Sequence, residues 1–218
     1  MLLSIDKRFL FIKGVKVAGS SIEIHAAPHL EETAVVTPMS NQGADADSFG
    51  TKWRPRNWQN GHGLPDFYDH MPAMQIRSVI GLWLYESMFK FGVIRNPYEK
   101  IRSLFFMNYL VRGEAYTVQE AIDSCPSEQV NLCDGENLIV HRVLEYERLD
   151  AELMEIFSLH DIPFDGRLKI KARSKPKMMY NGAEVRFDAT QVEFIRHKFR
   201  FEFDIYERRH VQIVANPD

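Results

Sequence analysis

The sequence predicts an α/β fold in which a small central parallel sheet is flanked by helices. Three short apolar segments have strand character: one begins at Phe9, and the others span 91–94 and 140–146. Helical patterns alternate with them, and this alternation favours parallel strands joined by right-handed crossovers. The 218 residues, 45% of them hydrophobic, suffice for one sizeable core, so we expect a single domain over residues 1–218.

Composition excludes several classes of protein. The formal net charge is −3, whereas a general nucleic-acid-binding protein presents a basic face. No run approaches the roughly 20 apolar residues of a membrane span, and the N-terminus lacks the pattern of a signal peptide. Cys125 and Cys133 form no metal-type pair and are expected to be reduced thiols. We therefore expect a cytoplasmic protein with no nucleic-acid or membrane partner.

The first apolar segment leads into a glycine-containing loop and a helix start. Gly14, Lys16 and Gly19 lie in the loop, and Ser20 and Ser21 open the helix. Loop amides and the positive end of a helix dipole converge in such an arrangement, which suits a phosphate. The loop is not a Walker A motif, because Ser20 stands where that motif has its lysine. A plain glycine turn with a solvated lysine is the alternative interpretation.

A second strand-to-helix junction follows residues 91–94. Arg95 ends the strand, Asn96 is predicted as the helix N-cap and Pro97 as the first helical residue, with Ser103 further along the helix. Ligands of open α/β sheets bind at this edge, and a guanidinium fork suits a phosphate. The alternative is an arginine paired with a nearby carboxylate.

Apolar spacing and capping residues predict four more helices. Two of them span 69–89 and 150–160, and the other two begin at the capping segments 117–120 and 188–191. His70 stands at the start of the first of these. A metal site at His25 and His29 would need the first helix to continue, but Pro28 is expected to end it.

Two segments have loop character. Residues 31–66 are rich in Gly, Asn, Asp and Pro and have few periodic apolar positions. A segment of this length is expected to be an acceptor-binding loop or lid, or else an ordered insertion. Residues 169–177 form a basic loop in which Arg173 and Ser174 either close over an anionic ligand or belong to a solvated turn.

Together these motifs resemble those of sulfotransferases that use PAPS (3′-phosphoadenosine 5′-phosphosulfate). Residues 16–21, Lys-Val-Ala-Gly-Ser-Ser, are similar to that family's 5′-phosphosulfate loop. Residues 93–105 are similar to its 3′-phosphate motif, in which an arginine and a serine lie eight positions apart. Residues 69–77 and 89–91 resemble the carbohydrate-sulfotransferase-like branch, where a histidine precedes the helix leading into the second motif.

The resemblance implies a P-loop-like fold and transfer of a sulfuryl group from PAPS to a hydroxyl of a carbohydrate or another small molecule, with release of PAP and no metal. It implies that Lys16 stabilises the departing PAP and that Arg95 binds the 3′ phosphate. His70 is the expected general base, with His62 as the alternative, because histidine titrates near neutral pH. The residues expected to bind the donor are Lys16, Ala18, Gly19, Ser20, Ser21, Arg95, Ser103, Arg173 and Ser174.

Two other functions stay open. A P-loop-type nucleotide kinase is disfavoured by the missing Gly-Lys-Ser/Thr and by the lack of an evident acidic Walker B strand. A non-catalytic PAP- or nucleotide-binding protein of the same fold is favoured by Val15 and Val17, where the sulfotransferase family has proline and threonine. Loss of that proline loosens the loop, and loss of the threonine removes a hydroxyl expected to reach the phosphosulfate.

Overall fold

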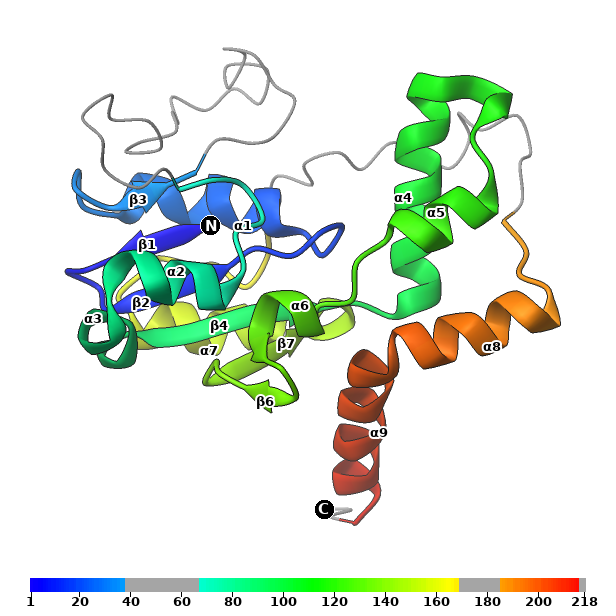
Figure 1. Ribbon diagram of the computed structural model, residues 1–218. Coiled ribbons are helices and arrows are strands. Elements are labelled where there is room, and N and C mark those ends of the chain that lie inside the picture. The colour runs from blue at the N-terminus through cyan, green and yellow to red at the C-terminus, as the bar shows by residue number, and fades with distance from the viewer. Residues whose placement is uncertain (38–66, 169–184, 216–218) are drawn as a thin grey trace.

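The computed structural model describes residues 1–37, 67–168 and 185–215 (Figure 1). Most of the predicted insertion at 31–66 lies outside these ranges. The predicted donor-binding residues Arg173 and Ser174, and the alternative base His62, also lie outside them. In the part of the chain that is described, no helix has the length and apolar character needed to cross a bilayer.

Five strands form a mixed sheet in the order β3–β1–β2–β4–β7. They are β1 (Leu2–Ser4), β2 (Phe9–Ile12), β3 (Val35–Val36), β4 (Phe89–Ile94) and β7 (Arg142–Glu145). The α/β class is confirmed, and β2, β4 and β7 are parallel as predicted. The prediction of a wholly parallel sheet was wrong, because β1 is antiparallel to both β2 and β3. A short turn joins β1 to β2, and only antiparallel strands can be joined in that way.

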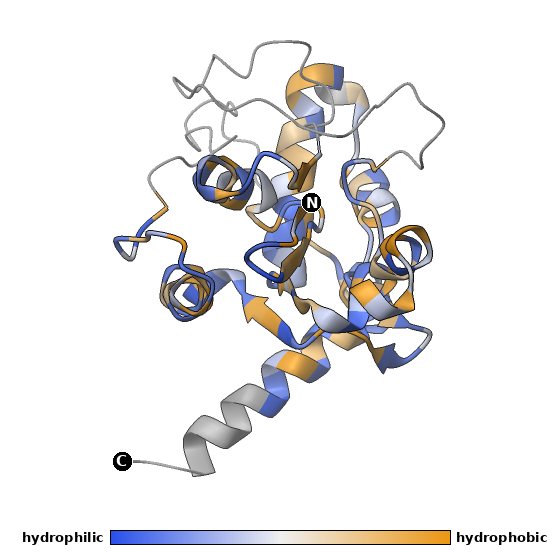
Figure 2. Ribbon diagram, turned by 90° about the vertical axis from the view of Figure 1, so that its left-hand side faces the viewer, coloured by the Kyte–Doolittle hydropathy of each residue, from blue (hydrophilic) through white to orange (hydrophobic). Residues whose placement is uncertain are grey.

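Helices cover both faces of the sheet (Figure 1). The helices α1 (Gly19–Ala26) and α7 (Leu149–Leu159) pack on the face that receives Phe9 and Phe11 of β2. The opposite face receives Leu10 and Ile12 and is covered by α2 (Ala73–Ile80), α3 (Leu82–Ser87) and α6 (Gln129–Leu132). Figure 2 shows apolar strands at the centre with helices of mixed character around them. A strand buried on both faces reads as a continuous apolar run, which explains the Phe-Leu-Phe-Ile sequence.

A third apolar cluster lies beside the sheet, where the chain leaves β4. It is formed by α4 (Pro97–Arg112), α5 (Val118–Ser124), α8 (Ala189–Lys198) and α9 (Arg200–Ala215). The remaining described elements are the hairpin of β5 (Cys133–Asp134) and β6 (Asn137–Leu138) and the 3-10 turns η1 (Ala27–His29), η3 (Gly113–Ala115) and η4 (Tyr146–Arg148). The α4–α5 pair therefore stands at the edge of the sheet where the predicted site is expected (Figure 1).

Most predicted helix ends are confirmed. Asn96 accepts hydrogen bonds from the amides of residues 98 and 99 and caps α4, and capping boxes open α5 at Thr117 and α8 at Asp188. The predicted helix over 69–89 was wrong in its bounds. Gly81 adopts a φ of 82°, which divides α2 from α3. Phe89 already belongs to β4.

Candidate functional site

The two predicted phosphate motifs meet at one edge of the sheet. The glycine loop follows β2, and Arg95 follows β4, the parallel neighbour of β2. The carboxyl ends of neighbouring parallel strands lie together, so the two motifs approach each other. Arg95 Nη1 donates a hydrogen bond to the carbonyl oxygen of Lys16 at 3.2 Å. Two segments 79 residues apart in the chain are thus joined by a direct contact.

The loop has an unusual backbone at two positions. Lys16 and Ala18 adopt φ values of 61° and 64°, in the left-handed region that non-glycine residues rarely occupy. Val17 between them does not have a positive φ, so the two conformations alternate. Successive amides in such an alternation point into one concavity and bind anions. Residues held in this region cost about 1–3 kcal/mol each and cluster at ligand-binding sites.

The side chain of Val17 faces the core and not the outer side of the loop. It is fully buried in the cluster that includes Phe11 and Ile22. A threonine at this position would place its hydroxyl among apolar side chains. The expectation that the valine removes a phosphate-binding hydroxyl therefore finds no geometric support. Valine at this position instead anchors the loop to the core.

The first turn of α1 completes the concavity. The amides of Ser21 and Ile22 donate to the carbonyl of Ala18. The amides of Gly19 and Ser20 have no acceptor in the described part of the chain. The first amides of a helix have no partner inside it and point along its axis with the positive end of the dipole. These predicted residues therefore present open donors beside the Lys16 turn.

Arg95 is held against an aromatic ring and has one unpaired donor, its buried Nε. Its guanidinium carbon lies 4.2 Å from the centroid of the Tyr146 ring. Its Nε is buried and has no hydrogen-bond partner among the described residues, and no described carboxylate lies within ion-pair distance. The alternative interpretation, an arginine paired with a carboxylate, is therefore not observed in these ranges. Because a buried polar group without a partner is costly, an anion at this nitrogen would stabilise the arginine.

The helix α4 supplies the wall next to Lys16. The ammonium of Lys16 lies 3.7 Å from the sulfur of Met107, which is a weak contact. Ser103 is half-buried and precedes Met107 by one helical turn. Residues four apart share one helix face, so Ser103 lies on the face of α4 that meets the loop. The predicted 3′-phosphate serine therefore shares a helix face with Met107.

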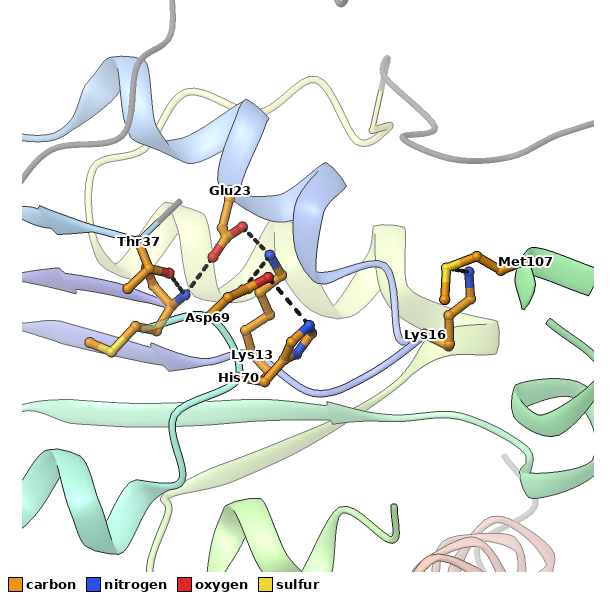
Figure 3. Close-up of polar contacts among 8 residues, drawn as sticks. Lys13, Lys16, Glu23, Thr37, Asp69, His70 and Met107 are labelled. Atoms are coloured by element: carbon orange, nitrogen blue, oxygen red, sulfur yellow. Dashed lines mark hydrogen bonds and ion pairs between the residues drawn. The ribbon is translucent and has the colours of Figure 1, made fainter. Parts of the chain in front are cut away.

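A buried ionic cluster, here called the Lys13 cluster, supports the loop from the strand side. It consists of the Met1 ammonium, Lys13, Glu23 and Asp69 (Figure 3). Lys13 Nζ lies 2.7 Å from a carboxylate oxygen of both Glu23 and Asp69, and the other oxygen of Glu23 lies 2.5 Å from the Met1 ammonium. A Cβ on Gly19 would come within 2.4 Å of Lys13 Cγ, so the loop rests directly on this lysine.

His70 lies beside the Lys13 cluster at the start of the loop. Its Nδ1 lies 3.2 Å from the carbonyl oxygen of Lys13, and its Nε2 lies 3.4 Å from Asp69 Oδ2. Burial lowers the pKa of His70, and the Asp69 charge opposes this shift only in part. The ring is therefore mainly neutral near pH 7. Figure 3 shows the Lys16 side chain directed toward Met107, so the two predicted catalytic residues do not contact each other.

A second buried network, here called the Lys100 cluster, supports the loop at Gly14. It consists of Lys100, Glu128 and Glu202, from α4, the residue before α6, and α9. Lys100 Nζ lies 2.5 Å from Glu128 Oε1, and Glu202 accepts a hydrogen bond of 2.7 Å from the Glu128 amide. A Cβ on Gly14 would come within 2.1 Å of Glu128 Oε2. The glycine is therefore required by the approach of a carboxylate.

Neither cluster is part of the sequence-based prediction. The available signal is a charged residue in an otherwise apolar context: Lys13 directly follows a buried strand, and Glu23 lies between Ile22 and Ile24 in α1. Such charges are rarely buried unless they are paired. The pairing itself is long-range, since Asp69 lies 56 positions after Lys13 (69 − 13). No local pattern reveals it.

The other candidate ligands have structural roles. As predicted, α1 ends before Pro28, and His25 stacks on Phe157 at 5.4 Å between ring centroids. Cys125 and Cys133 are free and buried, and burial raises the pKa of each thiol to about 11. Among the described residues, no group of three or more histidine, cysteine or acidic side chains is arranged to hold a metal ion.

Comparisons with protein-family models, curated proteins and solved structures give no match. The function must therefore be inferred from the site itself. The site combines unpaired amides at a helix start, an arginine whose buried Nε has no partner among the described residues, a lysine in the loop and a largely neutral histidine. This set of groups suits an anionic ligand and a proton acceptor beside it.

Proposed function

We propose that the protein is a PAPS-dependent sulfotransferase with a P-loop-like fold, which moves a sulfuryl group to a hydroxyl of a carbohydrate or another small molecule. The contact between Arg95 and the Lys16 loop carries this proposal. The 3′ phosphate and the 5′ phosphosulfate of PAPS are attached to one ribose, so a protein that binds both needs two anion sites within reach of one sugar. The two junctions supply such a pair at one edge of the sheet.

The donor-binding roles follow from the open groups. The amides around Gly19 and the start of α1 suit the 5′ phosphate, and Ser20 and Ser21 lie in the same turn. The Arg95 guanidinium suits the 3′ phosphate, with Ser103 on the same helix face as Met107. Arg173 and Ser174 remain predicted donor contacts. No metal is required, because the protein supplies fixed positive charge at both ends of the donor.

The transfer step needs charge stabilisation and a proton acceptor. The acceptor oxygen bonds to sulfur, the bond from sulfur to the bridging oxygen breaks, and the electron pair remains on PAP. Lys16 stabilises that oxygen as its charge develops, after its flexible side chain leaves Met107. His70 takes the proton of the acceptor hydroxyl. Each group thus acts on a different atom of the reaction.

A second candidate, a non-catalytic PAP- or nucleotide-binding protein, is favoured by one observation. Both ring nitrogens of His70 face oxygen atoms of the protein itself, at 3.2 and 3.4 Å. A ring whose two nitrogens both face the protein leaves less room for an acceptor hydroxyl, which favours binding without transfer. PAP binding without sulfuryl transfer to any acceptor in a broad screen would support this candidate.

The variants Lys16→Ala and Arg95→Ala test the proposal. Arg95→Ala should weaken PAP binding by about 10- to 100-fold in calorimetry, because a charge-assisted hydrogen bond contributes about 1.5–3 kcal/mol. Lys16→Ala should lower kcat with PAPS by about 10²- to 10³-fold, as loss of a donor at a developing charge does.

Arg102→Ala is the matched control. Arg102 lies on α4, pairs with Glu99 at 2.6 Å and contacts the Phe187 ring. Its replacement removes an arginine charge from the helix that follows Arg95 and should leave both PAP affinity and turnover unchanged. Donor affinity and turnover near the wild-type values in both test variants would contradict the assignment.

A further inference from the structure

Asp69 joins the buried Lys13 cluster to the half-exposed ring of His70. One carboxylate oxygen lies 2.7 Å from Lys13 Nζ, and the other lies 3.4 Å from His70 Nε2. The Asp69 side chain is 7% exposed, whereas that of His70 is 28% exposed. We propose that Asp69 is a positioning residue that orients His70 and stabilises its protonated form during transfer, an inference that rests on the proposed function.

The hydrogen-bond arrangement around the ring carries this inference. A neutral imidazole has one N–H donor and one nitrogen lone pair, whereas an imidazolium has two donors. The His70 ring faces two acceptors, the Lys13 carbonyl at Nδ1 and the Asp69 carboxylate at Nε2. Only the imidazolium satisfies both. The surroundings are therefore better suited to the ring after proton uptake than before it.

The charges near His70 keep this preference from fixing the ring in its protonated form. Burial, the Lys13 ammonium and the Met1 ammonium lower the pKa of His70, while Asp69 and the Lys13 carbonyl raise it. The net shift is downward, so the resting ring is mainly neutral and able to accept a proton. Burial alone would raise the pKa of Asp69, but Lys13, His70 and the Met1 ammonium hold it well below its usual range. Asp69 is thus a carboxylate throughout the range in which His70 titrates.

The proton path follows from these contacts. Nδ1–H donates to the Lys13 carbonyl, which leaves the lone pair on Nε2 for the acceptor hydroxyl. Its proton moves to Nε2 as the acceptor oxygen bonds to sulfur, and the resulting positive charge lies beside Asp69 Oδ2. The half-exposed ring then releases the proton to solvent. The long 3.4 Å contact allows the hydroxyl to approach Nε2 while the carboxylate remains close.

The first test needs no turnover and measures the pKa of His70 by NMR titration of its imidazole. Asp69→Asn keeps the side-chain shape and removes the charge that raises this pKa, so the pKa should fall further. Glu23→Gln is the matched control, because it removes a carboxylate from the same Lys13 ammonium without contacting His70. An equal shift in both variants, or none in Asp69→Asn, would overturn the inference even if sulfuryl transfer is established.

The second test measures rate against pH with PAPS and an acceptor. Asp69→Asn should lower kcat by about 10- to 100-fold, part of the roughly 10²- to 10⁴-fold that a general base supplies, and leave KM for PAPS unchanged. The acidic limb of kcat/KM should move to lower pH. In a His70→Ala background, Asp69→Asn should cause no further loss.

The two tests separate the failure of the inference from the failure of the proposed function. An additive loss in the double variant, or a lower rate with an unmoved pH profile, would show that Asp69 acts only on the fold and would overturn the inference. Absence of sulfuryl transfer by the wild-type protein would overturn the proposed function and, with it, the catalytic part of the inference. The NMR titration would still decide whether Asp69 controls the charge of His70.

Discussion

The Lys13 and Lys100 clusters support the same loop from two sides and differ in where they end. Both place a buried lysine between carboxylates, and both approach a loop glycine closely, at Gly19 and at Gly14. The Lys13 cluster has two cations and two carboxylates and ends at the half-exposed His70. The Lys100 cluster has one cation and two carboxylates, and all three of its residues are buried. A buried charge network can fix a backbone in either form, but only one that reaches a partly exposed titratable group can act on a ligand.

The largest expected effect is on stability, from Lys100→Met. Its loss leaves Glu128 and Glu202 buried with no cation within the cluster, and breaking such a pair costs about 3–5 kcal/mol. Lys13→Met should cost less, since Glu23 keeps the Met1 ammonium and Asp69 keeps His70. Urea unfolding measures both.

Lys198→Met is the control for Lys100→Met. Lys198 binds the carbonyls of residues 122 and 123 from a half-exposed position and forms no ion pair among the described residues. Its replacement should cost about 1–2 kcal/mol, because its two hydrogen bonds are partly exposed to solvent. If Lys13→Met were as costly as Lys100→Met, the equal number of cations and carboxylates in the Lys13 cluster would not make it more tolerant than the Lys100 cluster.

An intermediate effect is expected from alanine at the two loop glycines. A Cβ at Gly14 meets the Glu128 carboxylate at 2.1 Å, and a Cβ at Gly19 meets Lys13 Cγ at 2.4 Å. Each substitution should cost about 1–3 kcal/mol, as overpacking does, and should weaken PAP binding. The His70 imidazole titration should change in Gly19→Ala and stay unchanged in Gly14→Ala. Equal changes in the two variants would show that the clusters act on the site as one unit.

The features that the sequence predicted are local ones. The strand β2 is a continuous apolar run, and β4 and β7 each contain a short apolar stretch. The helix starts at Asn96, Thr117 and Asp188 depend on residues at most three positions apart. The strands β1 and β3 are too short for their two or three residues to show a period. Of the site, the Lys16 loop and Arg95 could be found because each is a motif at a strand end.

The supporting contacts could not be predicted, because their partners are distant in sequence. Glu202 reaches the Glu128 amide across 74 positions, and Arg95 reaches the Lys16 carbonyl across 79. His70 was selected for its residue type and its place before the helix that leads into the second motif, and nothing in its neighbourhood indicates that Asp69 is bound to Lys13. The break at Gly81 was also missed, since a single glycine in an apolar helical pattern does not by itself end a helix.

The smallest expected effect is a difference between the clusters in the pH dependence of stability. Burial raises the pKa of Glu202 above its ordinary 4.5, so its stabilising contribution is complete below that pH and is lost as the pH rises through the folded-state pKa. The pKa of Asp69 is instead held below its ordinary 3.8, so its contribution is present above that pH and is lost as the pH falls. Glu202→Gln should therefore become more stable relative to wild type as the pH rises above about 4.5 toward neutrality. The stability deficit of Asp69→Asn relative to wild type should instead shrink as the pH falls below about 3.8. Urea unfolding of the two variants across this range measures both slopes, and slopes of the same sign would show that the two clusters do not differ in charge balance.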